Sequence, residues 1–275
     1  MNKRTLYSIA GVLIILGVYA YEHFLVEEEK SEIVSEGETV KTNTNEYFLP
    51  TSTTGQIVHH EEYSLSYSEA HEQAEWVAYE LKKAHLSSTN HKRPYFEIDE
   101  AVKTGAAHWR NYKNSGFDRG HLCPAGDRRY NQSAYDETFL TSNISPQSHQ
   151  FNAGIWNRLE QKVRYWASKY NGVFVVTGGV LKGTTETIGD EYVSVPNQFY
   201  KVLIDTNSGE TKMIAFLMPH ENSNKPLYKF VVSVDTIEKL TGIDFFPELD
   251  DVVEDKLEAS NSYKEWVFNT ISHLK

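Results

Sequence analysis

The feature of this sequence that most constrains its fold is a helical pattern that leads straight into an apolar strand, between residues 151 and 181. In "FNAGIWNRLEQKVRYWASKY", Phe151 to Tyr170, apolar side chains recur at helical spacing and form one stripe. That stripe consists of Ile155, Leu159, Val163 and Trp166. Asn171-Gly172 ends the helix, because these residue types accept the left-handed conformation of a helix terminus. The segment "VFVVTGGVL" that follows is typical of a buried strand.

Shorter patterns around this unit predict further elements. They are short strands at 56–67, 74–81 and 231–234, a hairpin of 198–205 and 211–218 around "TNSGE", and a short helix at 236–240. For "HEQAEWVAYEL" a helix is the alternative, and periodicity does not decide between the two. Asp235 is expected to cap the short helix and Gly242 to end it. Because strands and helices do not alternate strictly, these patterns favour an α+β fold with a largely antiparallel central sheet flanked by helices.

The N-terminus has the pattern of a targeting segment. "MNKRTLYSIAGVLIILGVYAYEHF" begins with basic residues and then runs without a charge from Leu6 to Ala20, about the length of a signal-peptide apolar region. Val18-Tyr19-Ala20 fits a cleavage site, whereas extension to Val26 reaches the length of a tilted membrane helix. Residues 1–26 are therefore expected to be a signal peptide or a membrane anchor. Both alternatives place the rest of the chain outside the cytoplasm, either anchored by a single pass or secreted or periplasmic.

A linker is expected between this segment and the folded domain. Residues 27–45, "EEEKSEIVSEGETVKTNTN", are acidic and poor in large apolar side chains, which is typical of a flexible spacer. The folded domain is then expected to span residues 46–272. The chain of 275 residues is long enough for one domain of this size with its own core.

Charge is distributed unevenly along the chain. The net charge of −11 alone argues against a nucleic-acid partner, since phosphate binding requires a basic face. Residues 101–182, however, contain eleven Lys and Arg against five Asp and Glu, so this segment carries +6 and the remainder −17. The basic segment surrounds "GFDRGHLCPAGD", residues 116–127, which combines carboxylates, an arginine, a histidine and the only cysteine.

That single cysteine limits the chemistry of the chain. It excludes an internal disulfide and a zinc site built from several thiolates. Spacing does not single out Cys123 as a nucleophile, so we interpret it as a small buried residue.

The long helix carries a row of four residues at spacings of four, which places them on one side of the helix. The row consists of Asn152, Trp156, Glu160 and Arg164. For the helix in isolation, the favoured interpretation is a solvated face with an ordinary Glu-Arg pair. The alternative is a face on which a polar partner docks.

Three segments together reverse that preference. They are "SGFDRGHLCPAGDRR", "ETFLTSNISPQ" and "FNAGIWNRLEQKVR", with weaker agreement in "GIDFFPEL". In this order they resemble the DNA/RNA non-specific endonucleases, the ββα-metal nucleases that include endonuclease G and carry an Asp-Arg-Gly-His motif. The resemblance covers residues 47–266 and implies a ββα-metal nuclease fold. It also implies metal-dependent hydrolysis of DNA and RNA that leaves 5′-phosphate and 3′-hydroxyl ends.

The resemblance implies roles for five residues. His121 would be the general base, because a neutral imidazole can accept a proton from water near neutral pH. Asn152 would be the one direct protein ligand of Mg²⁺, with Mn²⁺ or another divalent cation as the alternative. Glu160 would contact the ion through water, or else only pair with Arg164. Arg164 and Arg119 would face the phosphate, and a structural role for Arg119 is an equal alternative.

Further residues follow from the same resemblance. Asp118 would touch the metal through water, or else stabilise a turn. Asn143 would orient His121 by hydrogen bonding, which fixes the tautomer of the base. Gly120 would permit a close backbone approach or an unusual dihedral angle. Arg93 in "KRPYFEID" is the nearest candidate for an upstream arginine at the site.

Nucleic acid is the expected partner, bound through phosphate contacts that carry no sequence information. Basic and aromatic residues before the motif are expected to line the groove, with core or surface roles equally open; they are His108, Trp109, Arg110, Tyr112 and Lys113. The membrane, through an uncleaved N-terminus, and a homodimer are further expected partners. The alternatives are a phosphodiesterase of the same fold with a narrower substrate, a membrane-tethered module that binds nucleic acid without cutting it, and a toxin paired with an inhibitor.

Overall fold

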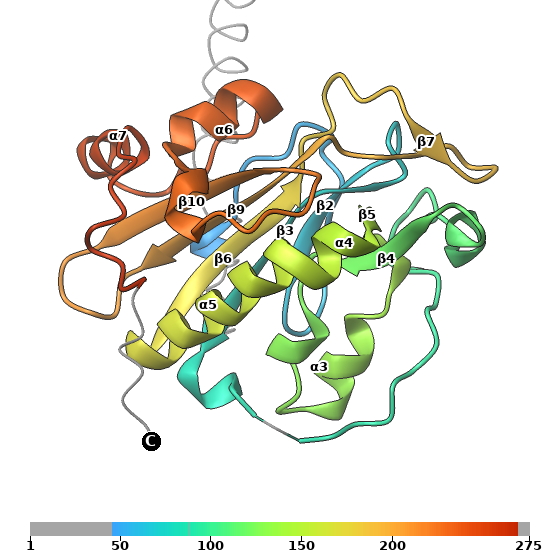
Figure 1. Ribbon diagram of the computed structural model, residues 1–275, viewed down its shortest axis with the longest axis horizontal. Coiled ribbons are helices and arrows are strands. Elements are labelled where there is room, and N and C mark those ends of the chain that lie inside the picture. The colour runs from blue at the N-terminus through green and yellow to red at the C-terminus, as the bar shows by residue number, and fades with distance from the viewer. Residues whose placement is uncertain (1–45, 88, 269–275) are drawn as a thin grey trace, which may run out of the picture. The chain divides into compact units, whose positions relative to one another are not determined.

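The structure, a computed structural model, describes residues 46–87 and 89–268 and is built around one seven-stranded sheet (Figure 1). The strand order is β1-β2-β3-β6-β9-β10-β11, and every neighbouring pair is antiparallel. These strands are β1 (Ile57–His59), β2 (Ser64–Ser68), β3 (Gln73–Lys82), β6 (Gly172–Gly179), β9 (Gln198–Asp205), β10 (Lys212–Pro219) and β11 (Val231–Val232). Two short antiparallel pairs are separate from this sheet: β4 (Phe117–His121) with β5 (Ile144–Ser148), and β7 (Thr187–Ile188) with β8 (Val193–Ser194).

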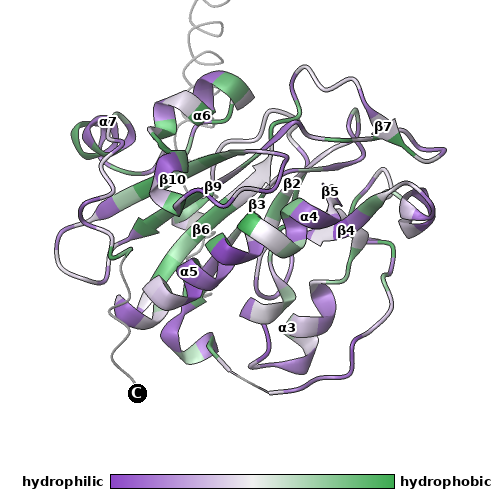
Figure 2. Ribbon diagram, in the orientation of Figure 1, coloured by the Kyte–Doolittle hydropathy of each residue, from purple (hydrophilic) through white to green (hydrophobic). Residues whose placement is uncertain are grey.

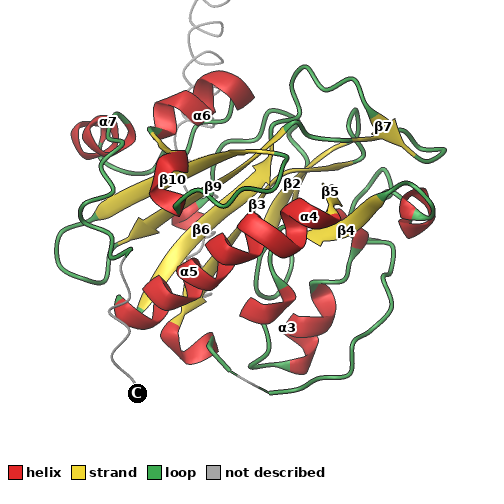
Figure 3. Cartoon of the chain, viewed as in Figure 1, coloured by secondary structure: helices red, strands yellow, loops and turns green. Residues whose placement is uncertain are grey.

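Helices lie against the sheet and beside it, as the red ribbons in Figure 3 show. They are α3 (Gln132–Glu137), α4 (His149–Phe151), a π-helical turn (Asn152–Trp156), α5 (Asn157–Lys169), α6 (Val234–Thr241) and α7 (Asp251–Glu258). Short 3₁₀ turns include Trp109–Tyr112, Ala125–Asp127 and Thr141–Asn143.

The central strands of the large sheet are buried on both faces. Their successive side chains point in opposite directions and so enter two different cores. In β6, Val173 and Val175 pack in one core with Leu159 of α5. Phe174 joins a second core, which includes Ile237 of α6. Figure 2 accordingly shows the central strands mostly in the green of apolar residues. The sheet thus separates α5 on one face from α6 on the other.

The predicted α+β class with a largely antiparallel sheet is confirmed. The 151–170 pattern is helical, and all four residues of its apolar stripe are buried. The predicted hairpin is the pair β9–β10, whose register joins Lys212 to Asp205. Gly242 ends α6 with φ 81°, as expected for a left-handed terminus.

Three expectations differ from the structure. The segment "HEQAEWVAYEL" forms part of strand β3, because both of its faces meet buried layers, and the helical alternative is wrong. Ser233, not Asp235, stands at the N-cap of α6, and Asp235 lies inside its first turn. "FDRGH", which no pattern assigned to a strand, forms β4. The segments predicted at 1–26 and 27–45 lie outside the described residues.

Candidate active site

The candidate site combines the β4–β5 pair with the helical segment that follows β5 directly. In this register Asp118 of β4 lies opposite Gln147 of β5. Because side chains alternate along a strand, Arg119 and His121 project on one side of β4, and Asp118 on the other. The chain leaves β5 as α4, beside β4 in Figure 3, and Asn152 thereby comes back to the β4 strand.

Asp118 and Asn152 are in direct contact. Nδ2 of Asn152 donates a hydrogen bond of 3.0 Å to Oδ2 of Asp118, and Nδ1 of His149 lies 2.9 Å from the same oxygen. The Asp118 side chain is 34% exposed, so solvent can reach it. This hydrogen bond involves only the amide nitrogen of Asn152. The amide oxygen, which is the atom that a hard cation would bind, takes no part in it. His149 is a neighbour that the sequence did not predict.

A widened helical turn presents Asn152. The turn Asn152–Trp156 is π-helical, and Gly154 within it has φ −97° and ψ −111°, outside the helical region. The side-chain oxygen of Asn222 accepts a 3.1 Å hydrogen bond from the backbone of Ile155. A Cβ at position 154 would lie 2.2 Å from that oxygen, so the turn requires glycine. A distant residue, Asn222, therefore shapes the turn that carries Asn152.

His121 lies in an aromatic niche. Its ring is 5.6 Å from that of Phe96 and 4.8 Å, edge to face, from that of Phe139. Burial lowers the pKa of His121 to about 4, and the positive charge of Arg93 contributes. The Nε2 atom is buried and has no hydrogen-bond partner among the described residues. The residue as a whole is half-buried, so part of His121 remains accessible to solvent.

The expected polar face of α5 is part of a partly buried charge network. Nε of Arg164 donates a 2.5 Å hydrogen bond to Asp127, and the Arg164 Nη2 atom lies 3.4 Å from Glu160. Asp127 is 1% exposed and also accepts a 3.0 Å bond from the Tyr79 hydroxyl. Burial raises the pKa of Glu160 to about 7, against the lowering effect of Arg164. The Arg164 guanidinium, expected to face the phosphate, thus binds Asp127, a residue that the sequence reasoning did not single out.

A second unexpected member of this region is Lys201 of β9. It is fully buried, its Nζ lies 4.9 Å from the centre of the Trp156 ring, and it has no hydrogen-bond partner among the described residues. Burial lowers the pKa of Lys201 to about 8, although Glu160 and Asp127 act in the opposite sense. A lysine in the middle of the apolar strand "QFYKVLID" is the signal that could have identified it.

The two other arginines differ in their surroundings. Arg119 donates to the backbone oxygen of Trp109 through Nε (3.3 Å) and Nη2 (3.1 Å), and its guanidinium lies 5.2 Å from the Phe96 ring. Arg119 is therefore held by protein groups. Arg93 is exposed and lies 5.7 Å from the same Phe96 ring, next to His121.

Asn143 supports the strand end, without a bond to His121. Its side-chain oxygen accepts from the backbone N–H of Cys123 at 2.8 Å, and its Nδ2 donates to the carbonyls of Cys123 and Thr138. In place of the expected bond to the imidazole, Asn143 thus bonds to the backbone of Cys123, two residues beyond His121, and to that of Thr138. Cys123 itself is buried, with its pKa raised to about 12 by burial.

Gly120 permits a close approach, as expected. A Cβ at this position would lie 2.2 Å from Cδ of Gln147 and 2.4 Å from its Oε1. Gln147 is fully buried, and neither atom of its amide has a hydrogen-bond partner among the described residues.

The residues expected to line a groove differ in their exposure to solvent. Arg110 and Lys113 are exposed and line a surface hollow that includes Phe117. Tyr112 is buried and belongs to a small core cluster, and Trp109 is half-buried against Arg119.

Known proteins are similar to this chain in sequence and in fold. The family model described as DNA/RNA non-specific endonuclease matches residues 41–252. "Nuclease EXOG, mitochondrial" of Danio rerio is 34% identical over 250 residues, which cover 85% of this chain and 72% of that protein. "Endonuclease G, mitochondrial" of Homo sapiens is 34% identical over 209 residues, 70% of each chain. A solved structure described as "Crystal structure of the EndoG/EndoGI complex: Mechanism of EndoG inhibition" aligns with TM-score 0.70 and 30% identity, and covers 76% of this chain and 91% of that one.

These relatives correct the expected location. The prediction of an extracytoplasmic chain, anchored or secreted, is contradicted, because EXOG of Danio rerio and Homo sapiens and human endonuclease G are all named as mitochondrial. In the described part of the chain, none of the helices has both the length and the apolar character needed to cross a bilayer. Neither the comparisons nor the described residues support the expected homodimer.

Proposed function

This chain belongs to the DNA/RNA non-specific endonuclease family and is an endonuclease, and from that premise we propose that His121 and a divalent cation held through Asn152 hydrolyse its DNA and RNA substrates. The family is divalent-metal-dependent. The observation that carries the proposal is the 3.0 Å hydrogen bond from Asn152 to Asp118, because it joins the helix to the strand that bears His121.

The donor atoms fit a hard cation, for which we propose Mg²⁺, with Mn²⁺ as the alternative. Asn152 offers an amide oxygen and Asp118 a carboxylate, and oxygen donors are those that Mg²⁺ prefers. Asp118 holds the amide nitrogen and so orients the oxygen. Glu160, whose side chain is 13% exposed, would hold the water shell of the ion. When bound, the ion supplies stabilisation of the negative charge that develops on the phosphate and on the leaving oxygen.

His121 would take the proton from the attacking water. Its pKa of about 4 keeps the imidazole neutral at pH 7, which leaves a nitrogen lone pair able to accept a proton. Because Nε2 is enclosed, Nδ1 is the acceptor in this proposal. A bound phosphate brings negative charge near the ring and raises its pKa toward the working pH, which strengthens the base. Attack on phosphorus in line with the 3′-oxygen leaves 5′-phosphate and 3′-hydroxyl ends.

We propose different roles for the three arginines near the site. Arg93, exposed beside His121, is available to contact the phosphate, where a guanidinium stabilises developing charge. Arg119 and Arg164 are bound to Trp109 and Asp127, so we propose that they act mainly by holding the strand and the helix in position.

Cleavage of supercoiled DNA and of RNA by the purified chain tests this proposal. Cleavage is expected with Mg²⁺, to stop in EDTA, and to return when Mg²⁺ is added in excess. The new ends should accept a radioactive phosphate only after phosphatase treatment, as 5′-phosphate ends do. Cleavage undiminished by EDTA, or ends that carry a 3′-phosphate, would contradict it, and cleavage of only one nucleic acid would favour the narrower substrate.

The role of Asn152 has its own test. Asn152→Ala should require a much higher Mg²⁺ concentration for half-maximal cleavage, whereas Asn152→Asp, which keeps an oxygen ligand, should require less than the alanine variant. Equal Mg²⁺ dependence in the wild type and Asn152→Ala would contradict the assignment.

A further inference from the structure

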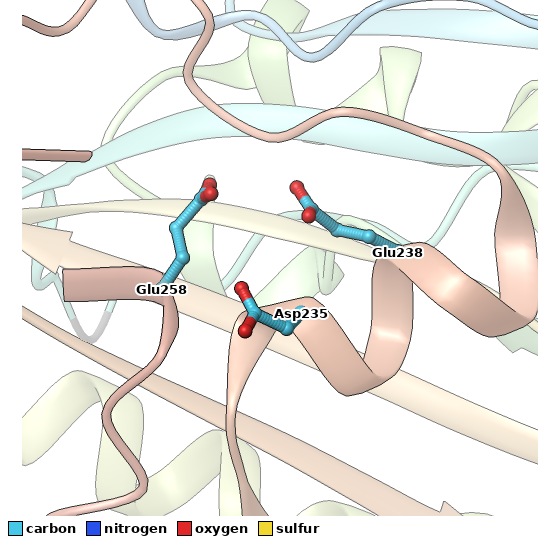
Figure 4. A group of neighbouring side chains, drawn as sticks. All are labelled: Asp235, Glu238 and Glu258. Carbon is cyan, nitrogen blue, oxygen red and sulfur yellow. The ribbon is translucent and has the colours of Figure 1, made fainter. Parts of the chain in front are cut away.

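Five carboxylates meet where α6 and α7 come together. Asp235 and Glu238 belong to α6, Asp244 follows it, and Glu254 and Glu258 belong to α7. Figure 4 shows Asp235, Glu238 and Glu258 pointing toward one another from the two helices. In each of two triads, Asp235–Glu238–Glu258 and Asp244–Glu254–Glu258, one oxygen per residue lies within 4.8 Å of the others.

Glu258 is the shared member of both triads and the most enclosed. It is 6% exposed, and its Oε1 atom is buried with no hydrogen-bond partner among the described residues. Oε1 of Glu254 is likewise buried and has no hydrogen-bond partner among the described residues. A buried carboxylate oxygen without a partner costs free energy, because it has lost its water and gained no donor. The Glu258 carboxylate is directed toward the other acids of the cluster (Figure 4), so its unpartnered oxygen indicates a ligand that supplies the missing positive charge.

No described cation supplies that charge. The ion pairs of the described residues include none of these five carboxylates. The one fixed donor among the described residues is the backbone N–H of Phe245, which donates a 3.0 Å bond to Oε1 of Glu238 and orients that side chain.

We propose that Asp235, Glu238 and Glu258 bind a divalent cation, with Ca²⁺ as the best fit, and that Asp244 and Glu254 complete its oxygen shell. The carboxylate oxygens of each triad lie within 4.8 Å of one another, which is close enough for one ion between them to contact all three residues. Ca²⁺ accepts six to eight oxygens in irregular geometry, whereas Mg²⁺ demands a near-ideal octahedron. The shared Glu258 of two triads suits the larger and more flexible shell.

This site is distinct from the candidate active site and does not depend on the proposed function. The α6 helix packs on the opposite face of the large sheet from α5, in the second core. The role of the bound ion would be structural. It would tie α7 to α6 and so hold the last described helix on the sheet.

Thermal unfolding with and without Ca²⁺ tests the proposal in three proteins: wild type, Glu258→Gln and Asn152→Ala. Ca²⁺ about a hundred-fold above its dissociation constant should raise the Tm of the wild type and of Asn152→Ala by about 5 to 10 °C. The same Ca²⁺ concentration should raise the Tm of Glu258→Gln far less. In EDTA, Glu258→Gln should be at least as stable as the wild type, because it removes repulsion without changing shape. Glu238→Gln should behave in the same way.

Three results would overturn the proposal. The first is an equal Ca²⁺ effect on the wild type and Glu258→Gln. The second is an unchanged Tm of the wild type in Ca²⁺, which would mean that the carboxylates bind no ion and that shared protons alone can relieve their repulsion. The third is a Ca²⁺ effect lost in Asn152→Ala but kept in Glu258→Gln. A larger shift with Mg²⁺ than with Ca²⁺ would overturn the choice of ion.

Discussion

Gly120→Ala should destabilise the β4–β5 pair through one identifiable clash. The added Cβ would lie 2.2, 2.4 and 2.5 Å from three side-chain atoms of Gln147, where ordinary contact begins near 3.4 Å. Gln147 is fully buried, and Gly120 is in register with Ser145, so neither the side chain nor the strand can move aside cheaply. Overpacking of this kind costs about 1 to 3 kcal/mol, and the short distances favour the upper end.

Urea unfolding of four proteins measures this: wild type, Gly120→Ala, Gln147→Ala and the double variant. The methyl group that Gly120→Ala adds fits the space that Gln147→Ala vacates, so the double variant should be more stable than the sum of the single effects predicts, by at least about 1 kcal/mol. Gly116→Ala is the matched control, because φ is +84° there and nothing lies within 4 Å. It should lose stability through backbone strain alone, without coupling to Gln147. The reasoning would be refuted if the free energy of unfolding of Gly120→Ala lay within about 0.5 kcal/mol of the wild-type value. Strict additivity of the two single-variant effects in the double variant would also refute it.

Three further predictions follow from buried groups. Cys123→Ala should keep cleavage within about two-fold of the wild type, and the native thiol should resist thiol reagents, since its pKa is about 12; loss of cleavage in a folded variant would give the thiol a chemical role. Burial lowers the pKa of His121 from 6.5 to about 4, so the unfolded chain takes up this proton first and stability should fall as pH drops from 6.5 to 4. Urea unfolding at stepped pH should show a smaller fall for His121→Gln, and identical profiles would contradict the assigned pKa. Arg128→Met should cost about 2 kcal/mol or more, measured by urea unfolding, because the buried guanidinium donates to the carbonyls of Glu62 and Glu80; an unchanged midpoint would show that those carbonyls find other donors.

The sequence predicts those parts of the fold that local pattern determines. The apolar stripe of α5 and the strand β6 follow from periodicity, and the left-handed end of α6 follows from Gly242. The π-helical turn could not be predicted, because it depends on a hydrogen bond to Asn222, far away in the chain. Strand β4 was missed for a related reason: its charged residues are stabilised by partners on other elements, such as His149 for Asp118.

In the candidate site, too, the sequence predicted some features, whereas others depend on tertiary packing. The family resemblance implied that Asp118 and Asn152 belong to one site, with a turn-stabilising role for Asp118 as the alternative, and the structure brings the two side chains into contact. The resemblance did not predict which groups hold the arginines, because Asp127 and the carbonyl of Trp109 become neighbours only through tertiary packing. Lys201 was missed because a strand pattern gives burial but not the cluster that a buried charge will face.

The central claim is that His121 is the base of a metal-dependent endonuclease, and the rate of plasmid nicking by His121→Ala at saturating Mg²⁺ tests it most directly. The variant should match the wild type in circular dichroism and bind DNA in EDTA with unchanged affinity. Its nicking rate should then be lower by at least about 100-fold, the smallest loss expected when a general base is removed. A folded His121→Ala protein that nicks DNA at the wild-type rate would contradict the account.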